Sequence, residues 1–112
     1  MADPRLRQIT IKTGVVKRLA KEKVSYEKEA SQQRKRIDRL KGEGADDHVL
    51  KKEEECYQES LMMVPDCQRR LVKAFTELDD YLKSEQELKE TKEYLAAFAV
   101  LTEAKEQMEN SP

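Results

Sequence analysis

Apolar residues recur every seven positions in the first third of the chain. The series consists of Ile9, Val16, Lys23, Ala30 and Ile37, in which a lysine takes the middle position. A repeat of seven places its members in a narrow stripe along one face of a helix, as in a coiled coil. The sequence therefore predicts a long first helix with a coiled-coil-like seam that Lys23 interrupts.

A second series of seven is complete. It consists of Leu50, Tyr57, Val64, Leu71 and Leu78. Further apolar residues flank this line on both sides in its second half, whereas the flanking positions near its start are polar. Because a helix that is apolar on both flanks needs two neighbours to cover it, we expect a three-helix body and a two-helix arm at the end that holds residues 42–47.

Capping residues indicate where the first two helices begin and end. Asp3 is suited to cap a first helix that starts at Pro4, and Gly42 can end that helix. Asp46 or Asp47 can cap the second helix. The glycine-containing segment between residues 42 and 47 is therefore expected to be the first connection of the fold.

The third helix is predicted from a capping box and an apolar stripe. Ser84 and Glu87 have capping-box spacing, which places the start of this helix directly after a tight turn. The stripe that we expect to face the core consists of Leu88, Leu95, Phe98 and Leu101.

These patterns predict an all-α fold, an elongated antiparallel three-helix bundle with coiled-coil-like packing. The expected helices cover about residues 4–41, 47–82 and 85–108, a polar tail covers 109–112, and residues 1–112 form a single domain. Pro65 lies inside the second helix, where it removes a backbone hydrogen bond. Since the apolar series continues beyond it, we expect the helix to be kinked there and not interrupted.

Composition narrows the class of protein. Aromatic residues make up 5% and charged residues 40% of the 112 positions, so the chain can form one domain without a large compact core. The longest uncharged apolar run, Tyr94 to Leu101, is far shorter than the ~20 residues that cross a bilayer, and no signal peptide follows Met1. We therefore expect a soluble cytoplasmic protein with no membrane partner, in which Cys56 and Cys67 are reduced and buried or half-buried.

Charge is distributed unevenly along the chain. Residues 1–41 carry a formal charge of +8, residues 42–83 a charge of −5 and residues 84–112 a charge of −4. A basic helix that faces two acidic helices favours antiparallel packing. The alternative is a nucleic-acid site on the first helix, densest at residues 34–36 and Arg39. No nucleic-acid-binding motif accompanies these residues and the acidic helices would repel phosphates, so we expect no nucleic-acid partner.

Catalytic signals are missing from the sequence. His48 is the single histidine, and no nucleophile stands at a recognisable spacing from it. Gly42 and Gly44 are not followed by the Lys-Ser/Thr pair of a phosphate loop. We therefore expect a protein that is not an enzyme and that uses neither a metal nor a cofactor.

One segment is a candidate binding surface. Met62, Asp66 and Arg69 fall on the side of the second helix that faces away from Val64, and Arg70 lies close by. A flexible thioether beside charged groups suits protein binding. The alternative interpretation is that the proline bends a long helix around its neighbours and that Met62 is a chance apolar residue on the surface.

The chain resembles the tubulin-binding cofactor A family. The longest matching segments are Ile-Lys-Thr-Gly-Val-Val-Lys-Arg-Leu at 11–19 and Pro-Asp-Cys-Gln-Arg-Arg-Leu at 65–71, with shorter ones at 1–5, 7–9, 26–30, 58–60 and 62–63. The resemblance implies a three-helix chaperone that captures quasi-native β-tubulin intermediates released by the cytosolic chaperonin. It also implies that they pass toward cofactor D and the assembly of the α/β-tubulin heterodimer. Since the sequence shows no nucleotide site, we expect this activity to need no nucleotide.

The resemblance further implies β-tubulin as the direct partner, the other tubulin-folding cofactors as indirect partners, and a location in the cytoplasm in association with the cytoskeleton. The residues that we expect to contact the partner are Met62, Asp66, Arg69 and Arg70 on the second helix, and Tyr26 and Glu27 on the first. Tyr26 can instead belong to the seam. The alternative function is a coiled-coil adaptor or scaffold that oligomerises through its helical seam.

Overall fold

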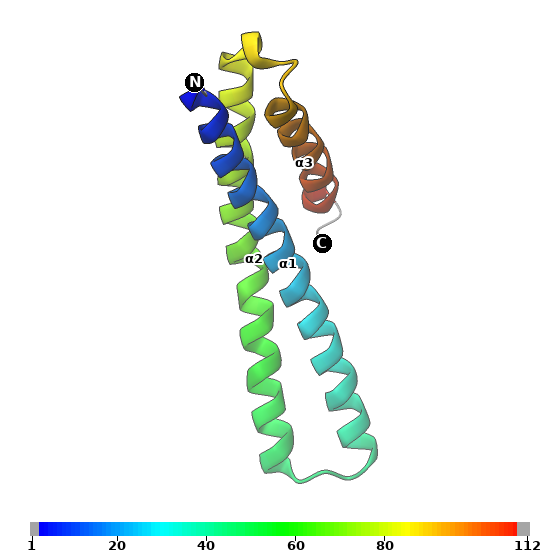
Figure 1. Ribbon diagram of the computed structural model, residues 1–112. Helices are drawn as coiled ribbons and strands as arrows, with labels where there is room; N and C mark the ends of the chain where they lie inside the picture. The colour runs from blue at the N-terminus through cyan, green and yellow to red at the C-terminus, as the bar shows by residue number, and fades with distance from the viewer. Residues whose placement is uncertain (1–2, 110–112) are drawn as a thin grey trace. The chain divides into compact units, whose positions relative to one another are not determined.

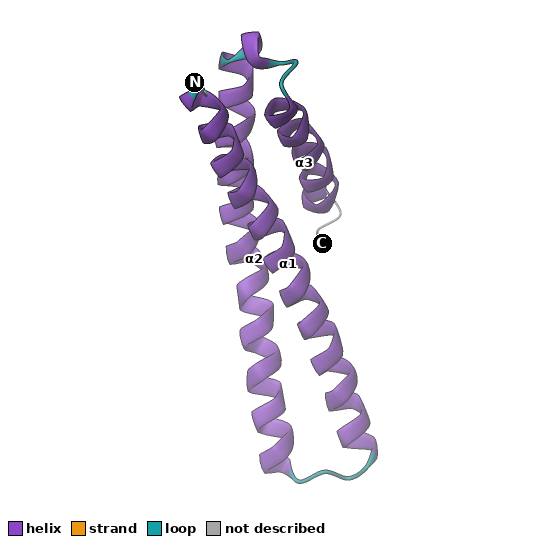
Figure 2. Cartoon of the chain, in the orientation of Figure 1, coloured by secondary structure: helices purple, strands orange, loops and turns teal. Residues whose placement is uncertain are grey.

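Three α-helices account for most of the chain (Figure 1). The computed structural model describes residues 3–109. In chain order they form α1 (Pro4–Gly42), α2 (Asp47–Ser84), the short 3-10 helix η1 (Gln86–Leu88) and α3 (Lys92–Glu109). Residues 3–109 contain no strand (Figure 2), so the prediction of an all-α, three-helix fold is confirmed. Of the predicted tail, residues 110–112 lie outside the described range, and Glu109 is the last residue of α3.

The first two helices begin where the sequence predicts. The carboxylate of Asp3 accepts a hydrogen bond from the backbone N–H of Arg5 at 2.9 Å, and that of Asp46 accepts one from the N–H of His48 at 2.8 Å. Each acceptor satisfies an N–H of the first helical turn that has no partner within the helix. Asp46 and not Asp47 is therefore the cap of α2, while α2 itself continues through Pro65 to Ser84.

A glycine in a left-handed conformation closes α1. Gly44 has a φ of 74°. The N–H of Ala45 donates to the carbonyl of Leu40 at 3.0 Å, and the N–H of Gly44 donates to that of Lys41 at 3.2 Å. This pair of bonds is the Schellman motif, which needs a residue with positive φ after the helix end. Gly42 is the last residue of α1, as predicted, but Gly44 makes the turn.

Replacing Gly44 with alanine is expected to lower the free energy of unfolding by about 1 kcal/mol, because a Cβ is disfavoured at positive φ. Urea unfolding followed by circular dichroism measures this change. Gly42→Ala is the matched control, since Gly42 is helical and has open space around it. Equal stability of the two variants would contradict the assignment of Gly44 to the turn.

The predicted start of the third helix is wrong. Residues 85–91 form η1 and a turn, and α3 begins at Lys92, seven residues later than expected. The hydroxyl of Ser84 donates back to the carbonyl of Tyr81 at 2.8 Å, so it does not form a capping box with Glu87. The cap of α3 is instead Thr91, whose Oγ1 accepts a hydrogen bond from the N–H of Tyr94 at 3.2 Å.

The buried face of α3 also differs from the prediction. Leu88 and Leu101 are buried, but Leu95 is 58% exposed and Phe98 is 61% exposed. The face that packs inward consists of Tyr94, Ala97, Leu101 and Ala104. Ala97 and Ala104 are small enough to allow close packing of helices on this face, and the larger Leu95 and Phe98 lie on the outward side.

The chain divides into two compact units. Among the described residues, unit 1 contains 3–21 and 68–109, and unit 2 contains 22–67. Three helical segments meet in unit 1, and two in unit 2. The prediction of one three-helix domain over residues 1–112 stays a prediction.

Unit 1 holds the main core, where the blue start of α1, the yellow-green end of α2 and orange α3 lie side by side (Figure 1). Ile9, Val16, Leu71 and Leu78 are fully buried there. The Tyr94 hydroxyl lies in the same core, where it donates to the carbonyl of Leu82 at 3.2 Å and so satisfies a carbonyl near the end of α2. The predicted seam and the predicted coverage by two neighbours are therefore confirmed in this unit.

Unit 2 is an antiparallel hairpin of α1 and α2 with a thin core. Ala30 and Ile37 of the predicted seam are buried in it. On α2, however, the predicted Leu50, Tyr57 and Val64 are only half-buried, whereas Ser60 and Cys67 are buried. Because a single neighbour covers α2 here, only one narrow line of positions is enclosed. The expectation for Cys56 was wrong, since it is exposed.

Polar contacts hold the two helices of unit 2 in register. The hydroxyl of Ser60 donates to the side-chain oxygen of Gln33 at 3.0 Å, and Arg36 lies 3.5 Å from the carboxylate of Glu53. Arg34 lies over the ring of Tyr57, 5.8 Å from its centroid. These contacts join the basic α1 to the acidic α2, as the charge distribution predicts.

An ionic cluster fastens the start of α1 to the connection before α3. The guanidinium of Arg5 donates to Asp3 at 2.6 Å, to Glu85 at 2.7 Å and also to Glu87. Chiefly through the side-chain hydrogen bond from Arg5, the pKa of Asp3 lies below its ordinary value of 3.8. The three carboxylates in turn raise the pKa of Arg5, so this group stays charged.

This cluster predicts a sensitivity to acid. Because folding lowers the pKa of Asp3, its contribution to stability is fully present above the unfolded-state value of 3.8 and is lost as pH falls through the folded-state pKa. As the pH falls from about 4 through the folded-state pKa of Asp3, the wild type is expected to lose more stability than Asp3→Asn, which keeps a good cap but cannot titrate. The urea midpoints of the wild type and of Asp3→Asn, measured across this pH range, test this prediction. Glu90→Gln serves as the control. If Asp3→Asn lost as much stability in acid as the wild type does, the link between Asp3 and the acid sensitivity would be refuted.

Candidate interaction surface

Residues 62–70, which we name the Pro65 segment, present a large apolar side chain to solvent. Met62 is 73% exposed on α2 of unit 2, and Asp66, one turn further along, is half-buried. Arg69 and Arg70, which belong to unit 1, are both exposed. Met62 is therefore exposed as the sequence predicts, while the assignment of these four residues to one binding surface stays a prediction.

Tyr26 and Glu27 lie on α1 of unit 2. Both are half-buried, and the carboxylate of Glu27 lies 3.6 Å from the ammonium of Lys23. Lys23 itself is 1% exposed. The register set by the Ser60–Gln33 and Arg36–Glu53 contacts brings Tyr26 level with the segment around Pro65. Within unit 2, the structure therefore brings Tyr26 and Glu27 to the same level as Met62 and Asp66.

A groove between α2 and α3 in unit 1 was missed by the sequence analysis. It encloses about 560 Å³, and its apolar lining consists of Phe75, Phe98, Leu101 and Met108. Lys83 lies at its edge and is paired with Asp79 at 2.9 Å, which raises the pKa of the lysine. Its sequence signal is Phe98, but the helical spacing of this residue predicts a place in the core.

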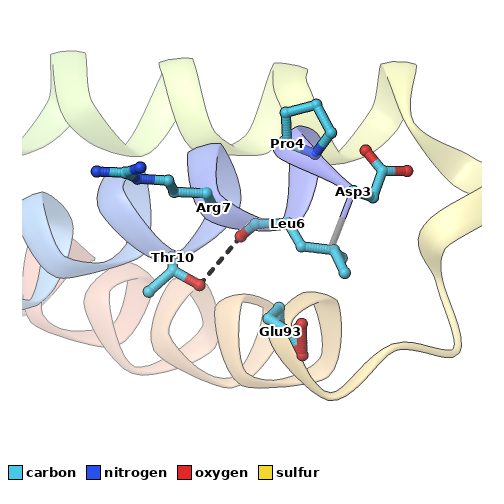
Figure 3. Close-up of a pocket in the computed structure, with 6 residues that line it drawn as sticks. All are labelled: Asp3, Pro4, Leu6, Arg7, Thr10 and Glu93. Atoms are coloured by element: carbon cyan, nitrogen blue, oxygen red, sulfur yellow. Dashed lines mark hydrogen bonds between the residues drawn. The ribbon is translucent and has the colours of Figure 1, made fainter. Parts of the chain in front are cut away.

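A second open groove lies between the start of α1 and the start of α3 (Figure 3). It encloses about 550 Å³. Residues of α1, among them Leu6, Arg7 and Thr10, line it together with Glu93 of α3. The hydroxyl of Thr10 donates to the carbonyl of Leu6 at 3.0 Å, so it is directed along its own helix.

Neither a metal-binding cluster nor a membrane-spanning helix is found among the described residues. Within residues 3–109, no group of three or more His, Cys, Asp or Glu side chains is arranged to hold a metal ion. His48 is exposed in the first turn of α2. No helix in this part of the chain has the length and apolar character required to cross a bilayer.

Comparisons with known proteins all point to one family. Residues 4–101 match the model of the tubulin binding cofactor A family. The chain is 59% identical to the tubulin-specific chaperone A of Gallus gallus over 105 residues, which cover 94% of this chain and 97% of that protein. It is 42% identical to the tubulin-folding cofactor A of Arabidopsis thaliana over 88 residues, or 79% and 75% of the two chains.

Solved structures agree with the sequence comparisons. The human tubulin chaperone cofactor A superimposes with a TM-score of 0.80 at 51% identity, covering 91% of this chain and 99% of that one. The tubulin folding cofactor A of Arabidopsis thaliana superimposes with a TM-score of 0.83 at 36% identity, covering 92% and 97%.

Proposed function

We propose, since this chain belongs to the tubulin binding cofactor A family, that it captures β-tubulin folding intermediates and holds them in a quasi-native state. The general activity, that of a tubulin chaperone, follows from membership of this family, which is not a class of enzymes. The observation that carries the proposal is the similarity to tubulin-specific chaperones over nearly the full length of both chains.

The proposed holding activity depends on binding equilibria alone. A protein that binds a near-native form more tightly than other forms increases the population of that form by the difference in affinity. In this proposal the intermediates come from the cytosolic chaperonin, and they pass to cofactor D and to heterodimer assembly when those partners bind more tightly. No nucleotide is required, and the proposed location is the cytoplasm, in association with the cytoskeleton.

We assign the contact with β-tubulin to the predicted residues of both helices. The exposed Met62 supplies apolar area that adapts to a partner, and Arg69 and Arg70 supply exposed charge. Asp66, Tyr26 and Glu27 are half-buried, which restricts their side-chain motion before binding. Binding through them therefore costs less side-chain conformational entropy than binding through fully exposed side chains would.

The adaptor alternative requires a seam that is available to another chain. In unit 1 the seam residues Ile9 and Val16 are fully buried by α2 and α3, and in unit 2 Ile37 is fully buried. Because the chain covers its own seam, an oligomer could form through it only by opening the fold. This burial favours the chaperone over the adaptor.

The proposed specificity is tested on a native gel. Labelled β-tubulin released from the chaperonin is incubated with the folded full-length chain, and a new complex of lower mobility is expected. Labelled α-tubulin treated in the same way is expected to give no such band. A complex with neither subunit would refute the proposed function, and equal complexes with both would refute the β-tubulin specificity.

A further inference from the structure

The first half of α1 carries an exposed ridge that the proposed contact residues do not include. Its members are spaced by three or four residues and therefore lie on one face of the helix. We name this set the α1 ridge; it consists of Arg7, Thr10, Gly14, Lys17 and Lys21. All five residues are exposed and belong to unit 1.

The α1 ridge is cationic, and its charged side chains have no partner in the described part of the chain. From Pro4 to Lys21 the helix contains no acidic residue. Within residues 3–109, Arg7, Lys17 and Lys21 take part in no ion pair or hydrogen bond of their side chains, unlike Arg5 and Lys12, which contact Glu85 and Tyr81. Arg18, beside the ridge, is likewise exposed and unpaired in this range.

Gly14 in the middle of the ridge is not required by the fold. It has helical geometry, and a Cβ added there would meet nothing within 4 Å. A helix with glycine at an exposed interior position is less stable than the same helix with alanine there, by about the free energy of one weak hydrogen bond. Since no contact among the described residues explains this loss, the residue suits a surface on which another backbone comes close, as small residues do where helices pack tightly.

We propose that the α1 ridge is the docking surface for an acidic segment of the protein client, whose backbone lies over Gly14 and whose carboxylates pair with Arg7, Lys17 and Lys21. This proposal rests on the proposed function, because the client in question is tubulin. The exposed Ile11 at the margin of the ridge, 49% accessible, adds apolar contact. Glu93, which lines the groove next to Arg7 and Thr10, bounds the cationic area on the α3 side.

An acidic polypeptide fits this surface better than a nucleic acid does. The ridge is one helix wide, about 10 Å, and it contains no aromatic side chain on which a base could stack. Residues 68–112, which belong to the same unit as the ridge, carry a net negative charge that would repel a wider phosphate backbone. A single extended acidic segment needs only the width of one helix, so the ridge suits it better.

Gly14→Gln gives the sharpest test. Glutamine is a good helix former, so the variant is expected to raise the melting temperature by about 3 °C. Its side chain would also cover the site of close approach, so the affinity for chaperonin-released β-tubulin is expected to fall at least about tenfold. Ser31→Gln, which places the same side chain at an exposed position of α1 in unit 2, is expected to leave binding unchanged.

A charge reversal tests the ridge independently of Gly14. Lys17→Glu/Lys21→Glu is expected to weaken binding at least about tenfold and to flatten its salt dependence. Lys28→Glu/Lys35→Glu, equally exposed on α1, is the matched control and is expected to bind as the wild type does.

Wild-type affinity in both the glutamine and the ridge-reversal variants, or equal losses in the two control variants, would overturn the proposal. Binding of an RNA oligonucleotide that the ridge reversal abolishes would overturn the assignment to an acidic polypeptide. A wild-type chain that does not bind tubulin would instead refute the proposed function, so the two failures are distinguishable.

Discussion

Leu78→Ala is expected to lower the free energy of unfolding by about 3 kcal/mol. Leu78 is fully buried in the core of unit 1, where α1, α2 and α3 meet. Removing most of its side chain forfeits the free energy of transfer from water and leaves a cavity that three packed helices fill only in part. Urea unfolding followed by the helical circular dichroism signal measures the change, with an expected fall in the midpoint at an unchanged slope.

Val72→Ala is the matched control for this prediction. Val72 lies on the same helix and in the same unit but is 42% exposed. Its truncation is expected to cost less than about 1 kcal/mol, because little buried surface is lost. Similar losses for Leu78→Ala and Val72→Ala would contradict the assignment of the core to the Leu71–Leu78 line.

Alanine replacements in the Pro65 segment are expected to weaken binding to β-tubulin. Met62→Ala and Arg69→Ala are each expected to lower the affinity about tenfold, and the triple variant with Asp66→Ala at least about a hundredfold, if these side chains form the centre of the contact. Since Met62 is 73% exposed, its truncation removes almost no contact within the fold, so helicity and stability are expected to stay unchanged. Quantitative native gels with labelled β-tubulin measure the affinities.

Val49→Ala serves as the control for Met62→Ala. Val49 is an apolar residue of α2 in the same unit and is 46% exposed, but it lies at the other end of the hairpin. It is expected to bind as the wild type does. If all Pro65-segment variants kept their helicity and bound β-tubulin with unchanged affinity, the proposed contact would be refuted. Met62 would then be a chance apolar residue on the surface.

The parts of the fold that sequence reasoning predicted correctly depend on local chemistry. Asp3 and Asp46 cap helices because their side chains accept from N–H groups two residues ahead. Ile9, Val16 and Ile37 are buried because their spacing alone places them on one face. Neither inference needs knowledge of what lies across the interface.

The errors occurred where neighbouring elements decide the outcome. Leu95 and Phe98 have a helical spacing, but so do Ala97 and Ala104, and the face that α3 buries is the one with these two alanines. Side-chain size therefore misled the prediction. The start of α3 was misplaced for a related reason, since residues 85–91 form η1 and a turn, in which Glu85 and Glu87 bind Arg5 from 80 and 82 residues away in the sequence. No local pattern signals such a contact.

The candidate site was only partly predictable. Spacing placed Met62 on an exposed side of α2, and the structure confirms its exposure. The half-burial of Tyr26 and Glu27 depends on the pairing of α1 with α2 in unit 2, which Ser60 and Gln33 fix through a polar contact. The open space around Gly14 requires the positions of all neighbouring side chains, so only the structure reveals it.

The most direct test of the account is the affinity of the folded wild-type chain for chaperonin-released β-tubulin after ATP has been removed. We predict a saturable complex that forms to the same extent with and without ATP, because holding depends on differential affinity alone. Failure of the folded chain to bind, or a complex that appears only while ATP is being hydrolysed, would contradict it.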